Sequence, residues 1–370
     1  MPFIDLQAQR ERIDADLRRR LDAVLEHGQF ILGPEVADFE SRLGRMCDVA
    51  HVQACANGTD ALVLALRALG VEPGDRVVVP AYTFSATAEA VALCGAIPVF
   101  ADVDARTFNV TAETVGEAMA RPDADGAPPV GVIVVDLFGQ APDYETIEAV
   151  AYASSAWVLA DAAQSIGGSF DGRPVGSLAR VTTASFFPAK PLGCYGDGGA
   201  VLTHDPEIAE LLASLHFHGK GEHQYDNVRV GYNSRLDSLQ AAVLLAKLEV
   251  FEDECDRRQT VAARYSAALE DVACVPWLDP QARSVWAQYT LLLEPEARDA
   301  VAATLRGRGV PVGIYYPIPV HRQTAYRKYA RDLVLPVAED LSRRALSLPM
   351  HAYLDESIQD AVIAELRRAL

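Results

Sequence analysis

Short apolar runs alternate with helical segments over residues 49–160, and this alternation limits the fold more than any other feature of the sequence. Each run is rich in Val, Ala or Leu and is bounded by Gly, Pro or polar residues, as buried strands are. The predicted strands are Val49–Ala54, Arg76–Val79, Pro98–Ala101, Val130–Val135 and Trp157–Ala160. Strands joined through helices form a parallel sheet with both faces covered, so the sequence predicts an α/β fold with a mostly parallel central sheet.

The pattern changes after residue 180. Two strand-like runs, Arg180–Phe186 and Ala200–Thr203, are separated by the glycine-rich link Pro191–Gly199 instead of by a helix. We therefore expect an antiparallel neighbour there, because parallel strands need a longer crossover. The link is not a nucleotide-binding loop, since such loops lead from a strand into a helix and this one leads into a strand.

The C-terminal third of the chain predicts a smaller unit. A helical pattern without Pro or Gly over Ser234–Leu269 predicts one long helix that bridges two domains. Strands are expected at Trp286–Leu293 and Pro311–Tyr316, followed by a terminal helix. We predict a large α/β domain with an N-terminal helix, residues 1–250, and a smaller α+β domain, residues 251–370.

Composition excludes several classes of protein. Apolar residues make up 50% of the 370-residue chain and charged residues 23%, which excludes intrinsic disorder. The formal net charge of −18 disfavours binding to nucleic acid or to an anionic membrane. No signal-peptide core and no run long enough to span a bilayer is evident, so the sequence predicts a soluble, cytoplasmic protein.

Cysteine and histidine spacing does not indicate a metal site. The six cysteines contain no CxxC pair, so we expect reduced thiols and neither a zinc knuckle nor a disulfide framework. His216, His218 and His223 lie close in sequence, but no carboxylate spacing supports them as ligands. We therefore expect no metal and interpret this segment as a mobile polar loop.

Polar residues follow the predicted strands, at the edge of the sheet where ligands gather in parallel folds. After Val49–Ala54, the segment Asn57-Gly58-Thr59-Asp60 opens a helix. Free backbone amides at such a helix start can hold an anion such as phosphate. Taken alone, this segment is explained better by an ordinary N-cap, with Asn57 or Thr59 as the capping side chain.

Asp161 and Lys190 follow two later strands. Asp161 could cap the next helix, or it could pair with a protonated ring nitrogen and keep that ring cationic. Lys190 lies between Pro188 and Pro191, in a rigid segment at the mouth of the sheet. Partial desolvation would lower its pKa and make the amine a nucleophile for a Schiff base, although most lysines are only solvated surface charges.

The anion-binding helix start at Asn57–Asp60, Asp161 and Lys190, in this order along the chain, together resemble the fold type I enzymes that use pyridoxal 5′-phosphate. Nearly the whole chain resembles one family of them, the DegT/DnrJ/StrS sugar aminotransferases. The segments that carry this likeness are Gly28–Pro34, Ala56–Ala61, Pro80–Thr87, Asp161–Ser165, Ser185–Lys190, Gly196–Gly199 and Asn233–Asp237. The resemblance implies an aspartate aminotransferase-like fold and pyridoxal 5′-phosphate as the cofactor.

The resemblance also implies roles for residues around the cofactor ring. Lys190 matches the lysine that forms the Schiff base, Asp161 the partner of the pyridine nitrogen, and Gln164 the residue beside the 3-hydroxyl group. Phe84 matches the aromatic residue that stacks on the ring, a contact that suits a flat π-system. A plain core position explains Phe84 nearly as well.

Phosphate binding and subunit sharing follow from the same resemblance. Gly58, Thr59 and Ser185 match residues that bind the cofactor phosphate. Asn233 matches a residue that reaches the phosphate of the neighbouring subunit, so the resemblance implies a homodimer with shared active sites. Asp197, where many relatives have Glu, is a mild departure from the family pattern.

The implied reaction is a ping-pong transamination from an amino acid donor, usually glutamate, to a nucleotide-linked keto sugar. Three segments are most similar to the branch that aminates C3 of UDP-2-acetamido-2-deoxy-3-oxo-glucuronate for surface polysaccharides or related glycans. These segments are Ser185–Gly199, Val230–Ala242 and Tyr315–Gln323. Candidate substrate-binding residues are Arg235, Tyr316, Tyr315 and His321. Arg235 suits a sugar carboxylate because a guanidinium offers a fork of donors.

Two alternatives stay open beside this interpretation. The segment Tyr315-Tyr316-Pro317 stands where that branch has His-Tyr-Pro, so another UDP- or dTDP-linked keto sugar, aminated at C3 or C4, is an alternative substrate. A non-catalytic, regulatory relative is the second alternative, and the presence of both Lys190 and Asp161 speaks against it.

Overall fold

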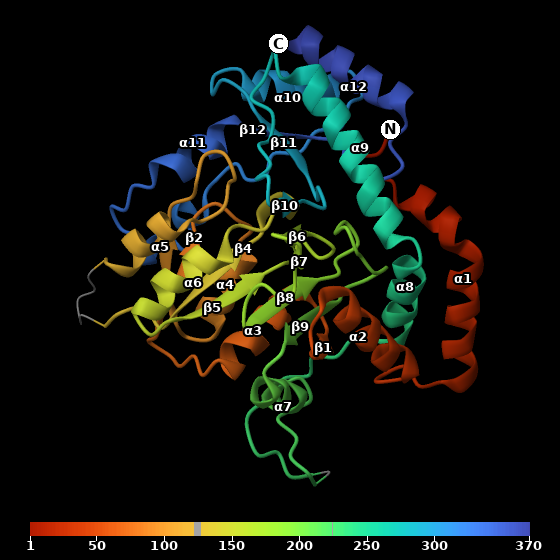
Figure 1. Cartoon of the computed structure of the whole chain (residues 1–370), viewed down its shortest axis with the longest axis vertical. Helices are drawn as coiled ribbons and strands as arrows, with labels where there is room; N and C mark the ends of the chain where they lie inside the picture. Colours follow the sequence, from red (N-terminus) through yellow and green to blue (C-terminus); the bar gives the residue numbers. More distant parts are fainter. Residues whose placement is uncertain (122–126, 224) are drawn as a thin grey trace.

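The computed structural model describes residues 1–121, 127–223 and 225–370. Within these residues a 7-stranded sheet has the order β1-β9-β8-β5-β4-β2-β3 (Figure 1). Its strands are β1 (His51–Cys55), β2 (Arg76–Pro80), β3 (Ile97–Ala101), β4 (Gly131–Val135), β5 (Trp157–Asp161), β8 (Val181–Ser185) and β9 (Gly199–Thr203). All pairs except those of β9 are parallel, which confirms the predicted α/β fold.

Helices cover the sheet, and their apolar faces supply much of the core. These helices are α2 (Pro34–Cys47), α3 (Gly58–Ala68), α4 (Ala86–Leu93), α5 (Ala112–Met119), α6 (Tyr144–Ala153) and α7 (Pro206–Leu215). The N-terminal helix α1 (Leu6–His27) instead packs Ile13 and Leu17 against Val243 and Ala246 of a later helix. The central helix α3 packs on β8 and β9 and is buried along most of its length, because its residues from Ala61 to Ala68 are nearly all apolar. In Figure 1, α7 lies at the lower edge of the chain, where it packs against α3 and β1.

Strand β9 is antiparallel to both of its neighbours, as predicted. Gly199, its first residue, pairs with Cys55 of β1 on one side and with Ser185 of β8 on the other. A Cβ atom on Gly199 would lie 2.3 Å from the carbonyl oxygen of Asn57, so a side chain there would force the turn before α3 to move. The register therefore brings the start of α3 next to the end of β8.

The predicted single helix over Ser234–Leu269 is wrong. The structure has two helices there, α8 (Ser238–Leu248) and α9 (Phe251–Leu269). The backbone of Val250 between them leaves the helical region, with φ −120° and ψ −1°. Three acidic residues, Glu252–Glu254, form the first turn of α9, where the helix dipole favours negative charge and stabilises a new N-terminus.

A smaller unit follows α9 and has its own buried cluster. Its elements are β11 (Tyr289–Leu292), α10 (Arg298–Gly307), α11 (Pro336–Arg344), β12 (Ala345–Leu348) and α12 (Glu356–Ala369). The cluster includes Tyr265, Tyr289, Leu305, Leu348 and Val362. We propose this unit as the smaller domain of residues 251–370 beside a large domain of residues 1–250.

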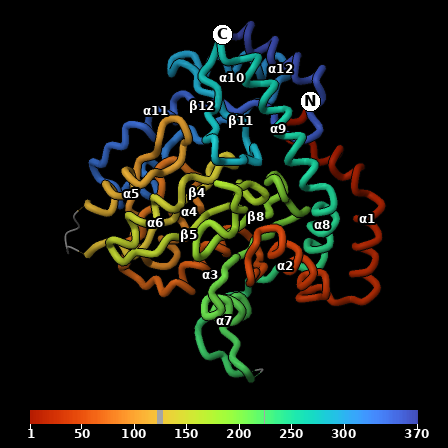
Figure 2. The backbone as a smooth tube through the Cα atoms, in the orientation of Figure 1, coloured from red at the N-terminus to blue at the C-terminus, as the bar shows by residue number. Residues whose placement is uncertain are grey.

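Both ends of the chain are attached to this smaller unit or lie beside it (Figure 2). The amide of Met350 donates to the carbonyl of Phe3 across 3.3 Å, before α1 begins. On the other side, Asp102 follows β3 and its carboxylate accepts the Val337 and Ala338 amides at the start of α11, at 3.0 and 2.8 Å. The sheet is thus tied to the C-terminal unit by a helix cap.

The predicted strand Pro311–Tyr316 is also wrong. In the described chain only Gly313 forms a β-bridge there, with β12. The Tyr316 amide donates to the Tyr82 hydroxyl at 3.1 Å, and that hydroxyl donates to the Tyr315 carbonyl at 2.6 Å. Backbone groups that a strand would pair with a neighbouring strand therefore bind a tyrosine side chain.

Two helices, α7 and α11, are absent from the sequence-based expectation. Each begins with proline in the first turn, Pro206 or Pro336, a position that proline favours. Before α7, the Asp205 carboxylate accepts the Glu207 and Ile208 amides at 2.9 and 3.3 Å.

Within the described residues, no helix combines the length and the apolar character that crossing a bilayer requires.

Glu40 of α2 makes a testable contribution to stability. Its carboxylate accepts the Ala54 amide of β1 at 2.8 Å, and burial raises the pKa of Glu40 to about 7. Because the unfolded carboxyl ionises near its ordinary value of 4.5, the folded form holds a proton over the pH window from 4.5 to 7. The stability that Glu40 provides is therefore fully present below pH 4.5 and is lost as the pH rises through 7.

We expect Glu40→Gln, which keeps the acceptor oxygen, to raise the unfolding free energy at pH 8 by about 1–3 kcal/mol relative to wild type. At pH 4 the two proteins should unfold at nearly the same denaturant concentration. Urea titrations at the two pH values measure this difference, and Glu26→Gln on the exposed face of α1 is the control. An equal effect of Glu40→Gln at both pH values would contradict the assignment.

Candidate active site

The ends of three neighbouring strands place the predicted site residues along one edge of the sheet. Asp161 ends β5 and pairs in register with Thr183 of β8, two residues before Ser185. Gly199 joins Ser185 to the turn before α3. The strand register alone therefore brings Asp161, Ser185 and Gly58 to one edge, as ligand-binding residues of open α/β sheets are placed.

Asp161 is a buried carboxylate in a fixed orientation. Only 5% of the residue is exposed. Its Oδ2 accepts the Thr87 hydroxyl at 3.0 Å and its Oδ1 accepts the Ala163 amide at 3.2 Å. Burial raises the pKa of Asp161, while the Ala163 amide, the charge of Lys190 and the Thr87 hydroxyl oppose the rise. Asp161 does not cap a helix, and the alternative interpretation as a cap is wrong.

Lys190 is the cationic counterpart of Asp161. Burial lowers the pKa of Lys190, and the charge of Asp161 opposes this, so the two side chains interact electrostatically. The Lys190 amide donates to the Phe187 carbonyl at 2.8 Å and closes a tight turn. Lys190 is thus a partly desolvated amine in a constrained turn, and the interpretation as a freely solvated surface lysine does not fit.

The start of α3 and the end of β8 form a small polar cup. A Cβ atom on Gly58 would lie 2.6 Å from the Cβ of Ser185 and 2.9 Å from its Oγ, so glycine is needed for this approach. Asn57 is the N-cap of α3 and accepts the Asp60 amide at 2.8 Å, which takes this amide out of the predicted anion site. Within the described chain the Gly58 and Thr59 amides have no acceptor, and they remain able to bind an anion.

Aromatic and amide side chains line the other side of the edge. Phe84 is 53% exposed and is not a core residue. The ring of Phe84 lies 6.1 Å from the ring of Tyr316. The Tyr316 hydroxyl accepts a long hydrogen bond of 3.4 Å from Nε2 of Gln164. The Oε1 atom of Gln164 accepts the Phe138 amide at 2.8 Å, which fixes the orientation of the amide group.

Asn233 and Arg235 lie in the segment that leads into α8. Asn233 is exposed, and its side-chain oxygen accepts a hydrogen bond from Arg235. The Arg235 guanidinium also stacks 4.8 Å above the ring of Phe217. Between them, Ser234 donates to Asp60 at 2.6 Å and so holds the segment against the start of α3. In one chain, Asn233 thus lies on a segment anchored beside the cup.

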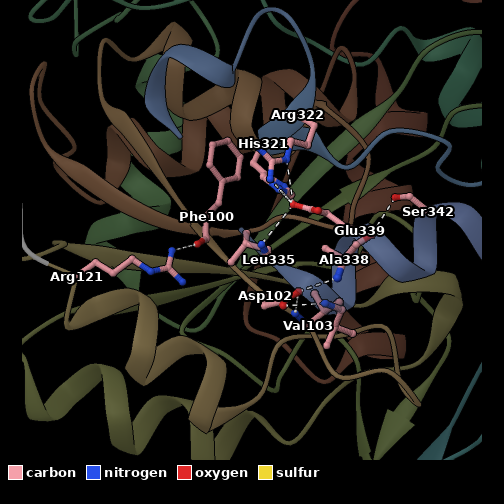
Figure 3. Close-up of polar contacts among 11 residues, drawn as sticks. Phe100, Asp102, Val103, Arg121, His321, Arg322, Leu335, Ala338, Glu339 and Ser342 are labelled. Atoms are coloured by element: carbon pink, nitrogen blue, oxygen red, sulfur yellow. Dashed lines mark hydrogen bonds and ion pairs between the residues drawn. The ribbon is translucent and has the colours of Figure 1, made fainter. Parts of the chain in front are cut away.

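His321 lies apart from these residues. Its side chain is fully buried, its Nε2 lies 3.1 Å from the Glu339 carboxylate, and its ring packs 6.1 Å from Phe100 (Figure 3). Arg322 pairs with the same Glu339 oxygen at 2.6 Å. This ion-pair cluster supports a structural role for His321 at the junction of the sheet with α11, and none of its contacts is with Lys190 or Asp161.

Three positioning residues were not singled out by sequence reasoning: Thr87, Ala163 and Tyr82. Thr87 is the second residue of α4, and its hydroxyl reaches Asp161 across 74 positions of sequence. Tyr82 orders the Tyr315–Tyr316 backbone, which carries the ring that faces Phe84. The sequence indicated them only as members of the segments Pro80–Thr87 and Asp161–Ser165, because their contacts join parts of the chain that are distant in sequence.

The arrangement fits a flat, phosphorylated, cationic heterocycle better than an ordinary core. Burial raises the pKa of the Asp161 carboxyl, so a cationic ring nitrogen beside it would stabilise the charged carboxylate. The carboxylate would in turn keep that ring nitrogen protonated. The Lys190 amine, whose pKa burial lowers, interacts with this carboxylate electrostatically, and the Gly58–Ser185 cup has free amides for a phosphate. The exposed Phe84 ring offers a stacking surface. Residues present in the chain thus fit pyridoxal 5′-phosphate.

Comparisons with known proteins agree with this fit. The sequence model of the DegT/DnrJ/EryC1/StrS aminotransferase family matches residues 11–367. The UDP-2-acetamido-2-deoxy-3-oxo-D-glucuronate aminotransferase of Pseudomonas aeruginosa is 44% identical over 365 residues, which are 98% of this chain and 99% of that protein.

Solved structures agree as well. A DegT DnrJ EryC1 StrS aminotransferase from Brucella abortus is 51% identical, with a TM-score of 0.96 over 100% of this chain and 99% of that one. NtdA of Bacillus subtilis, solved with bound cofactor PMP, is 29% identical, with a TM-score of 0.90 over 99% of this chain and 83% of that one.

Proposed function

Because this chain belongs to the DegT/DnrJ/EryC1/StrS aminotransferase family, we propose that it transfers the amino group of L-glutamate to C3 of UDP-2-acetamido-2-deoxy-3-oxo-glucuronate. The chain is a pyridoxal phosphate-dependent sugar-nucleotide aminotransferase. The observation that carries the proposed chemistry is the desolvated Lys190 amine beside the buried Asp161 carboxylate. The full-length similarity to the Pseudomonas enzyme supports the proposed substrate.

Each residue has a defined task in this proposal. The cofactor, when bound, supplies an electron sink for the bond that breaks at the amine-bearing carbon. Lys190 would hold the cofactor covalently and would carry the proton, a task that burial favours by lowering the pKa of its amine. Asp161 would keep the ring nitrogen protonated, and Thr87 and the Ala163 amide fix the orientation of its carboxylate.

The remaining predicted residues hold ligands. Gly58, Thr59 and Ser185 would bind the phosphate, and Gln164 and Phe84 would hold the ring from its edge and its face.

Arg235 is the proposed partner of the sugar carboxylate, with Tyr316 beside the reacting carbon. Tyr315 enters the proposal only through its backbone, which accepts from Tyr82. His321, buried against Glu339, receives no role in it.

We propose a homodimer in which Asn233 of each chain serves the site of the other. Exposed apolar side chains gather on loops beside Asn233 and at the entrance of α2, and single soluble chains rarely expose many of these. They are Phe30, Ile31, Leu32, Tyr225, Val228 and Val230.

A cytoplasmic location stays a prediction.

A panel of keto-sugar nucleotides tests the proposed substrate. Purified enzyme, pyridoxal 5′-phosphate and L-glutamate are incubated with 3-keto and 4-keto sugars linked to UDP or dTDP, and amine uptake is followed by mass spectrometry. We expect the 3-keto glucuronate to be used at least about tenfold faster than the matching 3-keto sugar without a carboxylate, because only the former pairs with Arg235. Arg235→Gln should remove this preference and leave the 3-keto preference intact.

Two results would redirect the assignment. A preference for a dTDP-linked or 4-keto sugar would favour the alternative aminotransferases of the same family. Equal use of sugars with and without the carboxylate, unchanged in Arg235→Gln, would contradict the role of the guanidinium.

A further inference from the structure

A second buried lysine lies under the segment that carries Lys190. Lys247, in the last turn of α8, is only 1% exposed. Its Nζ donates to the carbonyl of Gly193 and lies 4.5 Å above the ring of Tyr195. Both partners belong to the glycine-rich link that follows Lys190, and the proposed chemistry makes no use of this amine.

The burial of Lys247 is costly and calls for a role. Within the described residues no carboxylate lies within ion-pair distance of Nζ, so the carbonyl and the aromatic face replace its hydration. Burial lowers the pKa of Lys247 to about 8, and the charge of Glu254 on α9 opposes the fall. An apolar residue of the same length would fill the space without this cost.

The carbonyl that Lys247 holds is tightly coupled to the turn of Lys190. A Cβ atom on Gly193 would lie 2.6 Å from the carbonyl oxygens of Phe187 and Pro188. The backbone of Gly193 therefore packs directly against the backbone just before Lys190. The Lys190 amide bonds the Phe187 carbonyl at 2.8 Å, and the Cys194 amide bonds the Phe186 carbonyl at 2.8 Å. A displacement of Gly193 must therefore displace the turn that presents the Lys190 amine.

Gln240 provides a second anchor on the same helix. Its Oε1 accepts the Tyr195 amide at 2.9 Å, two residues beyond Gly193. Gln240 and Lys247 are seven residues apart, which is two helical turns, so both side chains leave the same face of α8. That helix is largely buried and packs against α1 and α2, with α1 beside it in Figure 1. A rigid helix thus grips the link at two points.

We propose that Lys247 is a positioning residue for Lys190, holding the Gly193 carbonyl so that the Lys190 amine stays in the geometry needed to bind the cofactor and move a proton. The inference rests on the proposed function, because it assigns Lys190 the covalent role. Lys247 itself touches neither the cofactor nor the substrate.

The test compares Lys247→Met with Lys328→Met. Methionine keeps the length and the packing of the buried side chain and removes the amine. Lys328 is an exposed lysine whose amine also lies over a tyrosine ring, at 4.7 Å from Tyr329, so it is a matched control outside the link. Each full-length protein is reconstituted with pyridoxal 5′-phosphate, and the covalent link is trapped with borohydride and located by peptide mass.

We expect Lys247→Met to form the trapped Lys190 adduct, and to turn over, at least about tenfold more slowly than wild type, since small displacements of a reacting group are costly. The KM values for glutamate and the keto sugar should change by less than about threefold, because the binding residues are untouched. Lys328→Met should match wild type in all three measurements. A purely structural loss would lower the melting temperature without this split between kcat and KM.

Several outcomes would overturn the proposal. The proposal would be refuted if the Lys247→Met variant folds and traps the cofactor at the same rate as the Lys328→Met variant. If Lys247→Met does not fold, Gln240→Met removes the other anchor of the link, and unchanged trapping in that variant would refute the inference. Failure of the proposed function is separate, because wild type would then trap cofactor at Lys190 yet transfer no amine to any keto sugar.

Discussion

Lys190→Ala should abolish the quenching of the cofactor's visible absorption by L-glutamate and lower amine transfer by about 10⁴-fold or more. Under the proposed role of Lys190, the variant loses both the covalent attachment and the amine that carries the proton, and in the described chain Asp161 interacts electrostatically with no other lysine. Absorption spectra before and after addition of L-glutamate, together with single-turnover transfer to a keto-sugar nucleotide, measure the two losses.

Two companion variants separate charge from covalent chemistry. Lys190→Arg keeps a cation beside Asp161 but cannot form the covalent link, so it should be as inactive as Lys190→Ala. Lys328→Ala, which removes an exposed lysine of the smaller unit, should retain wild-type spectra and rates. Undiminished transfer by Lys190→Ala would refute the assigned role, and activity in Lys190→Arg would reduce that role to electrostatics.

Much of the fold follows from local sequence signals. The five parallel strands before residue 161 were recognisable because each is a short apolar run between helices, and the antiparallel β9 because a glycine link replaces a helix. Errors occurred where tertiary contacts decide. The break at Val250 depends on how α8 and α9 pack, and Tyr315–Tyr316 is held by the hydroxyl of Tyr82, which is 233 positions away from Tyr315.

The site was predictable to a similar depth. Lys190, Asp161 and the turn at Gly58 follow strands, so their position at one sheet edge could be inferred from the order of elements. The side chains that orient them could not, since Thr87 reaches Asp161 from α4 and Lys247 reaches Gly193 from α8. His321, a basic residue in a family-like segment, is buried against Glu339, a contact that local sequence does not indicate.

The paired strand-end carboxylates of β4 and β5 permit a controlled test of the second catalytic assignment. Asp136, which directly follows β4, is fully buried and accepts the Tyr144 and Ser165 hydroxyls at 2.6 Å each. Burial raises the pKa of Asp136 to about 7. Its hydrogen-bond partners are two hydroxyl groups, and no cation contributes to its pKa shift. Asp161 is also buried but interacts with the charge of Lys190, and the two carboxylates interact with each other through charge. The two carboxylates therefore share an environment and differ in their facing groups.

Asp161→Asn should reduce kcat by about 10²–10³-fold, because an amide cannot keep the ring nitrogen protonated and the bound cofactor becomes a poorer electron sink. Cofactor loading, measured from the absorption of the reconstituted protein, should persist, since Lys190 and the Gly58–Ser185 cup are intact. The matched change Asp136→Asn should leave kcat within about threefold of wild type, because in the described chain the Asp136 carboxylate oxygens accept only the Tyr144 and Ser165 hydroxyls and Asp136 acts on Asp161 through charge alone. If Asp161→Asn turned over as fast as Asp136→Asn, the carboxylate of β5 would have no part in activating the ring.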